Sequence, residues 1–191
     1  MIKGIIVVIF TFLLAGCIAK PTHTMSSYEL HLEPAVTKSV SKGSKVIKLK
    51  YPTALGNLNS SRIFYKKDGK VSYYLYSKWS SALNRLIYKD ILLALKNSNR
   101  YKDVLSYSSS AIADRYLEVE IIDFYHVVNA NASYAKVAID IKVIDAKSSK
   151  IVKTKSYRYK KDLNIANAQN FVNSAKEALR EFLVDLNRDL R

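Results

Sequence analysis

The stretch YYLYSKWSSAL, residues 73–83, is where the sequence changes from the pattern of a strand to the pattern of a helix. Its first seven positions hold four aromatic rings, and aromatic residues favour strands. A stripe of apolar residues at helical spacing begins at Trp79 and continues to the polar Asn97-Ser98-Asn99 sequence. We therefore expect a strand followed directly by an amphipathic helix from Ser80, with Trp79 in the core where the two meet.

The tyrosines of this stretch are candidates for contact with other molecules. Alternation along a strand places Tyr74 and Tyr76 on one face, and Tyr73 and Leu75 on the opposite face. The tyrosines that point away from the helices cannot all be core, and aromatic residues are enriched in protein interfaces. We predict partner or subunit contact for Tyr73, Tyr74 and Tyr76.

Upstream segments predict further strands. Residues 62–66 and 71–76 are β-prone and are separated by Lys-Asp-Gly-Lys, in which Asp-Gly favours the tight turn of a hairpin. Residues 46–51 alternate between apolar and lysine side chains until Pro52 ends the pattern, which predicts a half-buried strand. Residues 28–32 alternate briefly and predict a short edge strand.

Downstream segments predict two long strands and a basic one. Residues 134–145 alternate without interruption, whereas the strand at 116–126 changes parity part-way along. Such a change predicts a β-bulge near Ile121 and Ile122. Residues 151–160 predict a last strand that is rich in lysine.

These patterns together predict one α+β domain over residues 46–191. A second amphipathic helix is predicted over about residues 165–190, where apolar residues again recur every three or four positions. We expect a single, mostly antiparallel sheet with both helices packed on one face, which is a two-layer sandwich. Residues 17–45 are rich in Ser, Thr, Lys and Pro, and we predict a flexible tether there.

The N-terminus has the layout of a secretion signal. Lys3 precedes an apolar run at residues 5–14, which is too short for a spanning helix of about 20 residues. The following LAGC sequence, residues 14–17, is similar to a bacterial lipobox, in which the chain is cut before an acylated cysteine. We therefore expect a signal peptide over residues 1–16 and lipid attachment at Cys17. The alternative is a stray cysteine after an ordinary signal peptide, and it is disfavoured because residue type, spacing and single occurrence all fit a lipobox.

Acylation of Cys17 predicts where the chain is located. One acyl chain binds a bilayer marginally, whereas several hold a protein there in effect permanently. Ile18 follows the cysteine, at the position where lipoproteins retained at the inner membrane of enteric bacteria commonly have Asp. We expect the periplasmic face of the outer membrane rather than the inner membrane. With one cysteine, the chain has no intramolecular disulfide and no thiolate metal site.

The chain is strongly basic, with 31 Lys and Arg residues against 16 Asp and Glu residues. Nucleic acid is excluded as a partner because a secreted, lipid-anchored protein does not meet it. The accessible polyanions are anionic phospholipid, lipopolysaccharide phosphate and acidic protein surfaces. The strand at 151–160 is the sharpest candidate for such contact, through Lys153, Lys155, Arg158 and Lys160. The alternative is an edge strand whose lysines prevent it from pairing with the edge strand of another molecule and so prevent aggregation.

The sequence offers no arrangement that would support catalysis or a cofactor. His23 and His31 fall in the predicted tether, and His126 falls at the end of a predicted strand, where a capping or partly exposed role is expected. None has a metal-ligand spacing to another His or acid on one helical face. Downstream of residue 16 only Gly43, Gly56 and Gly69 occur, so no phosphate-binding glycine loop exists. We predict a protein that is not an enzyme and holds neither metal nor cofactor.

Four short sequences carry a family resemblance. They are YEL at 28–30, LNSSRI at 58–63, YYLYSKW at 73–79 and ADRYLEV at 113–119, in this order. With the lipobox and the C-terminal helix, they make the chain similar to the ABC-type transport auxiliary lipoprotein family. The aromatic sequence that ends in Trp79 is the most specific of the four, although Ser80 stands where the family often has proline.

The resemblance implies partners and a setting. Members accompany MCE-type lipid transport systems, such as the paraquat-inducible one, at the outer-membrane end of a lipid route. The implied partners are an MCE-domain protein and an inner-membrane ABC permease with its ATPase, and some relatives form homo-oligomeric rings. The alternative is an independent periplasmic lipoprotein that binds lipid or lipopolysaccharide in a cavity of its own.

Overall fold

The computed structural model describes residues 24–32 and 42–190, so the predicted signal peptide and Cys17 lie outside the described residues. This part of the chain contains nine strands, which form one sheet, together with two α-helices and one short 3-10 helix. The elements in chain order are β1 (Ser26–Tyr28), β2 (Val46–Leu49), β3 (Thr53–Ala54), η1 (Gly56–Leu58), β4 (Arg62–Lys67), β5 (Lys70–Trp79), α2 (Leu83–Asn97), β6 (Asp103–Leu105), β7 (Arg115–Asn129), β8 (Ala132–Asp145), β9 (Ile151–Asp162) and α3 (Ala168–Asp189).

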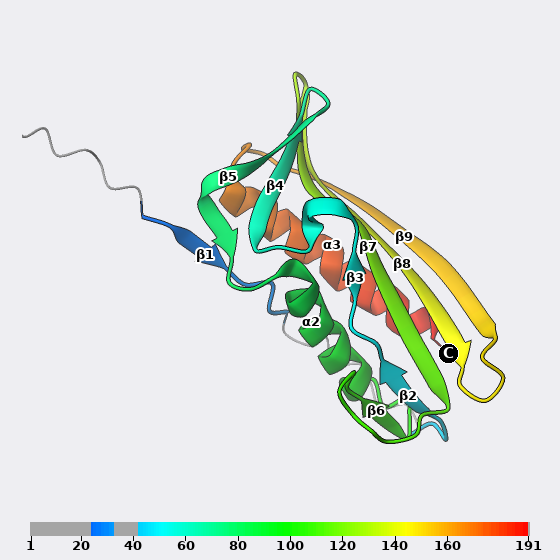
Figure 1. Cartoon of the computed structure of the whole chain (residues 1–191). Helices are drawn as coiled ribbons and strands as arrows, with labels where there is room; N and C mark the ends of the chain where they lie inside the picture. Colours follow the sequence, from blue (N-terminus) through cyan, green and yellow to red (C-terminus); the bar gives the residue numbers. More distant parts are fainter. Residues whose placement is uncertain (1–23, 33–41, 191) are drawn as a thin grey trace, which may run out of the picture.

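Strand β7 is the centre of the sheet (Figure 1). Along one edge it pairs with β8 over its whole length, and β8 then pairs with β9. Along the other edge it pairs in succession with β2, β3 and β4. The sheet continues from β4 to β5 and β1, and from β2 to β6. The result is a strongly curled half-barrel.

The prediction of a mostly antiparallel sheet is wrong. Five of the eight strand pairings are parallel, and only β4–β5, β7–β8 and β8–β9 are antiparallel. The physical reason is a crossover: α2 and β6 carry the chain back between β5 and β7, so that β7 runs in the same direction as β2, β3 and β4. Parallel pairing requires such a long connection, and it joins segments that are far apart in the sequence.

The predicted hairpin and the predicted bulge are both confirmed. In the β4–β5 turn, Asp68 and Gly69 have φ of 48° and 75°, the positive values that a tight hairpin turn requires. In the β7–β8 ladder, Ile121 pairs with Ile139 but Asp123 pairs with Ala138, so Ile122 is the extra residue. The side chains that face the helices therefore change parity after Ile121.

The two helices form the second layer of the fold. α3 packs on β7, β8 and β9, and α2 packs on α3 and β6 (Figure 1). α3 begins after Asn167, whose side-chain oxygen accepts a hydrogen bond from the backbone N–H of Asn170 at 2.8 Å. The inward residues of both helices and of the sheet form a single apolar cluster.

The start of α2 differs from the prediction. Trp79 is the last residue of β5, and α2 begins only at Leu83, so Trp79 is not part of the helix. Its predicted core position is nevertheless confirmed, because only 2 % of it is exposed. The strand pairing explains the difference: the backbone N–H of Trp79 donates to the carbonyl of Ser61, and that of Ser80 donates to Tyr28.

Residues 26–32 of the predicted tether pack on the domain. Ser26–Tyr28 pair in parallel with β5, and the side chains of Leu30 and Leu32 are buried in the same core cluster. Burial of these two leucines holds the segment on the domain although its other residues are mostly polar, because each leucine removes apolar area from water. The described part of this segment therefore brings the N-terminal side of the chain to β5.

Replacing Trp79 with alanine is expected to destabilise the fold by about 3–5 kcal/mol, because a large side chain would be lost from the core. The indole ring contacts the rings of Phe124 and Phe171, with centroid distances of 5.9 and 6.1 Å. Urea melts followed by circular dichroism measure the change, since the variant has no other tryptophan. The exposed Leu75→Ala variant is the control and should change stability by less than about 0.5 kcal/mol. An equally small loss for Trp79→Ala would contradict its core position.

Candidate functional site

The inner side of the β4–β5 hairpin contains a stack of aromatic rings. The His126 ring lies between those of Tyr74 and Phe171, nearly parallel to both, at interplanar angles of 12° and 14°. Its Nδ1 is 2.5 Å from the Tyr74 hydroxyl, and its Nε2 is 2.8 Å from the Ser133 hydroxyl. His126 is fully buried. These contacts link β5 to β7 and to α3.

The expectation of a capping or partly exposed His126 is wrong. The bulge at Ile122 changes the parity of β7, so that position 126 faces the helices. Burial lowers the pKa of His126 to about 4, and burial, with a smaller effect of Tyr65, raises the pKa of Tyr74 to about 12. Both groups are therefore uncharged at neutral pH. A serine beside an imidazole could suggest nucleophilic catalysis, but an enclosed imidazole with so low a pKa is a poor base.

The outer side of the same hairpin holds a second aromatic group, beneath cationic side chains. The Phe64 ring lies between those of Tyr73 and Tyr125, with centroid distances of 6.2 and 6.4 Å. The guanidinium carbon of Arg62 is 4.2 Å from the centre of the Tyr73 ring, and Lys66 Nζ is 3.9 Å from that of Tyr125. Cations over aromatic faces stabilise both partners where water is partly excluded.

The three tyrosines predicted to contact a partner therefore lie in different surroundings. Tyr74 points inward to His126, Tyr73 is half-buried on the outer side, and Tyr76 is half-exposed. A shift in register separates them, since Arg62 pairs with Lys78 whereas Phe64 pairs with Tyr73. Leu75, whose side chain is 64 % exposed, was not among the residues predicted to contact a partner. Its place beside Tyr76 in an irregular strand segment could not be predicted from alternation.

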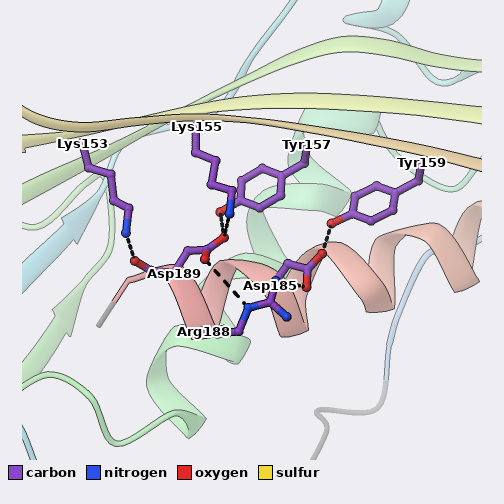
Figure 2. Close-up of polar contacts among 7 residues, drawn as sticks. All are labelled: Lys153, Lys155, Tyr157, Tyr159, Asp185, Arg188 and Asp189. Carbon is purple, nitrogen blue, oxygen red and sulfur yellow. Dashed lines mark hydrogen bonds and ion pairs between the residues drawn. The ribbon is translucent and has the colours of Figure 1, made fainter.

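The basic strand β9 lies against α3 (Figure 2). Lys155 Nζ and the Tyr157 hydroxyl reach the same oxygen of Asp189, at 2.5 and 3.0 Å. The Tyr159 hydroxyl donates to Asp185 at 2.7 Å. Lys153 donates to the backbone carbonyl of Asp189, and Lys161 pairs with Glu181. Every second residue from Lys153 to Lys161 therefore bonds to the C-terminal half of α3.

Matching periodicities explain this arrangement. Residues four apart on a helix are separated by about 6 Å, and residues two apart on a strand by nearly 7 Å. The acids Glu181, Asp185 and Asp189 are four apart and so lie opposite alternate residues of β9. Burial alone would raise the pKa of Asp189, but hydrogen bonds from Lys155 and Tyr157 lower it below its usual value. The pKa of Tyr159 is raised by burial and by its bond to Asp185.

All four predicted polyanion contacts have partners within the chain. Lys153 and Lys155 bond to Asp189, Arg158 Nη1 is 2.6 Å from Asp140, and Lys160 Nζ is 3.4 Å from Asp162. They also point to two different sides of β9, since positions 153 and 155 differ in parity from 158 and 160. Contact of these residues with an anionic surface stays a prediction. The structure shows that such contact would compete with existing ion pairs.

Within residues 24–32 and 42–190, no group of three or more His, Cys, Asp or Glu side chains is placed to hold a metal ion. Over the same residues, no helix is both long and apolar enough to cross a membrane.

Comparison with known proteins identifies the family. The model of the ABC-type transport auxiliary lipoprotein component matches residues 28–187. The chain belongs to this family. Its members are components of transport systems, and the family is not one of enzymes. The match begins at Tyr28, so acylation of Cys17 stays a prediction from the lipobox. No curated protein matches the sequence.

Two solved structures share the fold of this auxiliary lipoprotein, and a third is a weaker match. Protein XCC0632 from Xanthomonas campestris is 14 % identical with a TM-score of 0.74, covering 84 % of this chain and 92 % of its own. An uncharacterised protein is 11 % identical with a TM-score of 0.68, covering 88 % and 99 %. PelC from Paraburkholderia phytofirmans, solved as a dodecamer, is 11 % identical with a TM-score of 0.48, covering 78 % and 90 %.

Replacing Asp189 with asparagine is expected to cost about 1–3 kcal/mol at pH 7, because charge-assisted hydrogen bonds from Lys155 and Tyr157 would be weakened. The folded-state pKa of Asp189 is lowered, so its contribution is present at neutral pH and is lost as pH falls below about 4. Urea melts at pH 7 and pH 3 test both parts. The exposed Asp162→Asn variant should change stability by less than about 1 kcal/mol.

The auxiliary lipoprotein is also expected to lose about 2 kcal/mol of stability between pH 7 and pH 5 because of His126. The folded-state pKa of His126 is about 4 and its ordinary value is 6.5, so the unfolded chain takes up a proton first as pH falls. Urea melts at both pH values give the loss. His126→Gln should lose less over the same interval, and an equal loss in both proteins would refute this role.

Proposed function

We propose that the chain is a non-enzymatic, lipid-anchored accessory component of an ABC/MCE-type lipid transport system, acting as an adaptor or structural element. The observation that carries this proposal is the family match over residues 28–187, which includes nearly all of the described domain. The lipobox at Cys17 supports an anchor at the periplasmic face of the outer membrane. An MCE-domain protein and the inner-membrane permease and ATPase are the proposed partners, and a ring of copies is the proposed assembly.

A continuous apolar core among the described residues favours an adaptor over a carrier of acyl chains. A carrier needs an apolar gap wide enough for a lipid tail, whereas the described core side chains pack into one cluster between sheet and helices. A hollow of about 270 Å³ lies on the outer face of β7 and β8, and its lining includes Lys50, Glu118, Asp140 and Lys142. Charged walls of this kind do not suit an acyl chain.

The anchor is tested by mass spectrometry of the mature protein isolated from membranes. We expect a chain that begins at Cys17 and carries the added mass of a diacylglyceryl group and an N-terminal acyl group. The Cys17→Ser variant should keep residues 1–16 and gain no acyl mass. An unmodified mature chain would overturn the lipid anchor.

The role is tested by purifying the full-length lipoprotein from membranes in mild detergent. We expect an MCE-domain protein and an ABC permease to be recovered with the wild-type chain, and at least several-fold less of both with Cys17→Ser. Extraction of bound lipid from the same sample tests the alternative. Stoichiometric lipid without these partners would instead identify an independent lipid-binding protein.

A further inference from the structure

The edge of the sheet formed by β5 and β1 exposes four large apolar side chains. Met25, Val71 and Tyr76 are each about half exposed, at 49 %, 48 % and 50 %, and Leu75 is 64 % exposed. Ser26 pairs with Ser77, which places the preceding Met25 beside Tyr76. We call these four residues the β5 patch. Met25, Leu75 and Tyr76 are neighbours at this edge and Val71 lies further along the same strand, and exposed apolar side chains that adjoin one another indicate a binding surface.

The segment that carries the β5 patch is basic. Residues 62–79 contain five cations, Arg62, Lys66, Lys67, Lys70 and Lys78, and the single acid Asp68. Lys66 is paired with Asp123, and Arg62 covers Tyr73. The remaining three lysines are exposed and form no ion pair with any described residue. In this respect they differ from Lys155, Lys160 and Lys161 of β9, which are paired with acids.

The β5 patch is also the described surface that must stay near the proposed anchor. Met25 is the eighth residue after Cys17, and a fully extended chain of eight residues spans at most about 29 Å. An acylated Cys17 would therefore confine Met25 to within this distance of the bilayer surface. Confinement raises the local concentration of the patch at the membrane without any further contact.

We propose that the β5 patch docks on the bilayer that holds acylated Cys17. The apolar side chains lie at the level of the headgroups, where tyrosine is enriched, and Lys67, Lys70 and Lys78 lie against anionic phosphates. This inference rests on the proposed function, because it requires the lipid anchor. A protein partner would also fit an apolar edge, but proximity to the anchor and the unpaired lysines favour a lipid surface.

Docking of this edge orients the domain. The β2–β6 end lies at the opposite end of the sheet from the β4–β5 hairpin (Figure 1). That end carries Ile112, which is 94 % exposed in the connection between β6 and β7. Contact of the β5 patch with the bilayer turns Ile112 toward the periplasm, where a protein partner could reach it.

Fluorescence quenching by spin-labelled lipid tests the docking. Cys17 is the only cysteine and is consumed by acylation, so a cysteine introduced in Leu75→Cys provides one thiol for an environment-sensitive dye. Ile112→Cys is the matched control, because it is equally exposed to labelling at the opposite end. The acylated full-length proteins are placed in vesicles of phosphatidylethanolamine and phosphatidylglycerol that contain headgroup spin labels. We expect at least two-fold stronger quenching at position 75 than at position 112, and the same from Val71→Cys.

A second pair of variants tests the charge. Replacing Lys67, Lys70 and Lys78 with glutamine should reduce quenching at position 75 at least two-fold in low salt. Replacing Lys102, Lys147 and Lys150, which are exposed and lie outside residues 62–79, should leave it unchanged. Equal reduction by both triple variants would overturn the proposed contact of the hairpin lysines with phosphate.

Other outcomes separate this proposal from the proposed function. A mature chain without acyl groups overturns the function, and the docking with it, and mass spectrometry shows this before any dye is measured. An acylated protein with equal quenching at positions 75 and 112 overturns docking alone. Dyes that are shielded from water but not quenched, together with disulfide crosslinks between copies of Leu75→Cys, would show that the patch binds a second copy instead.

Discussion

The extra residue at Ile122 is the constraint on which the aromatic architecture of this domain depends. The partner strand β8 is regular at this point, so one inserted residue in β7 exchanges the faces of all residues that follow. Phe124 and His126 consequently face the helices, and Asp123 faces outward, where Lys66 and Lys136 pair with it. Without the bulge, Asp123 would face the apolar layer, and burying an unpaired carboxylate there would cost several kcal/mol.

The bulge also determines how the β4–β5 hairpin is held. Because His126 faces inward, the Tyr74 hydroxyl can bond to its Nδ1 from the neighbouring strand, with the two rings nearly parallel. Because Tyr125 faces outward, it packs with Phe64 and Tyr73 on the other side of the hairpin. Both faces of the hairpin are thus attached, while the edge beyond it, with Leu75 and Tyr76, stays exposed to solvent.

Ion pairing distributes the excess positive charge unevenly over the molecule. The acids of α3 neutralise much of β9, although this strand is the most basic segment of the sequence. The hairpin lysines have fewer acids within reach, so the part of the sheet formed by β4 and β5 keeps a net positive charge. A count of lysines along the sequence identifies β9 as the most basic segment. The positions of the carboxylates in the structure identify the β4–β5 hairpin as the segment in which Lys67, Lys70 and Lys78 form no ion pair with any described residue.

The elements themselves could be predicted because they depend on local patterns. Alternation, the Asp-Gly turn, the parity change at Ile121 and the helical stripes are each contained within about 20 residues. Pairing of β7 with β2, β3 and β4 could not be predicted, since it joins segments separated by a hairpin and a helix. The start of α2 at Leu83, rather than at Ser80, was missed for a related reason: the backbone of Trp79 and Ser80 bonds to Ser61 and Tyr28, in other segments of the chain.

The sequence by itself determined the strands and helices, the class of the fold, the bulge and the membership of the transport auxiliary lipoprotein family. The tertiary structure decided which strands pair, that His126 is a buried and uncharged part of an aromatic stack, and which lysines keep their charge unpaired. The physical reason is that burial and ion pairing depend on groups brought together from distant parts of the chain. The lysines of β9 and of the hairpin look alike in the sequence, and the acids of α3 together with Asp162 distinguish them.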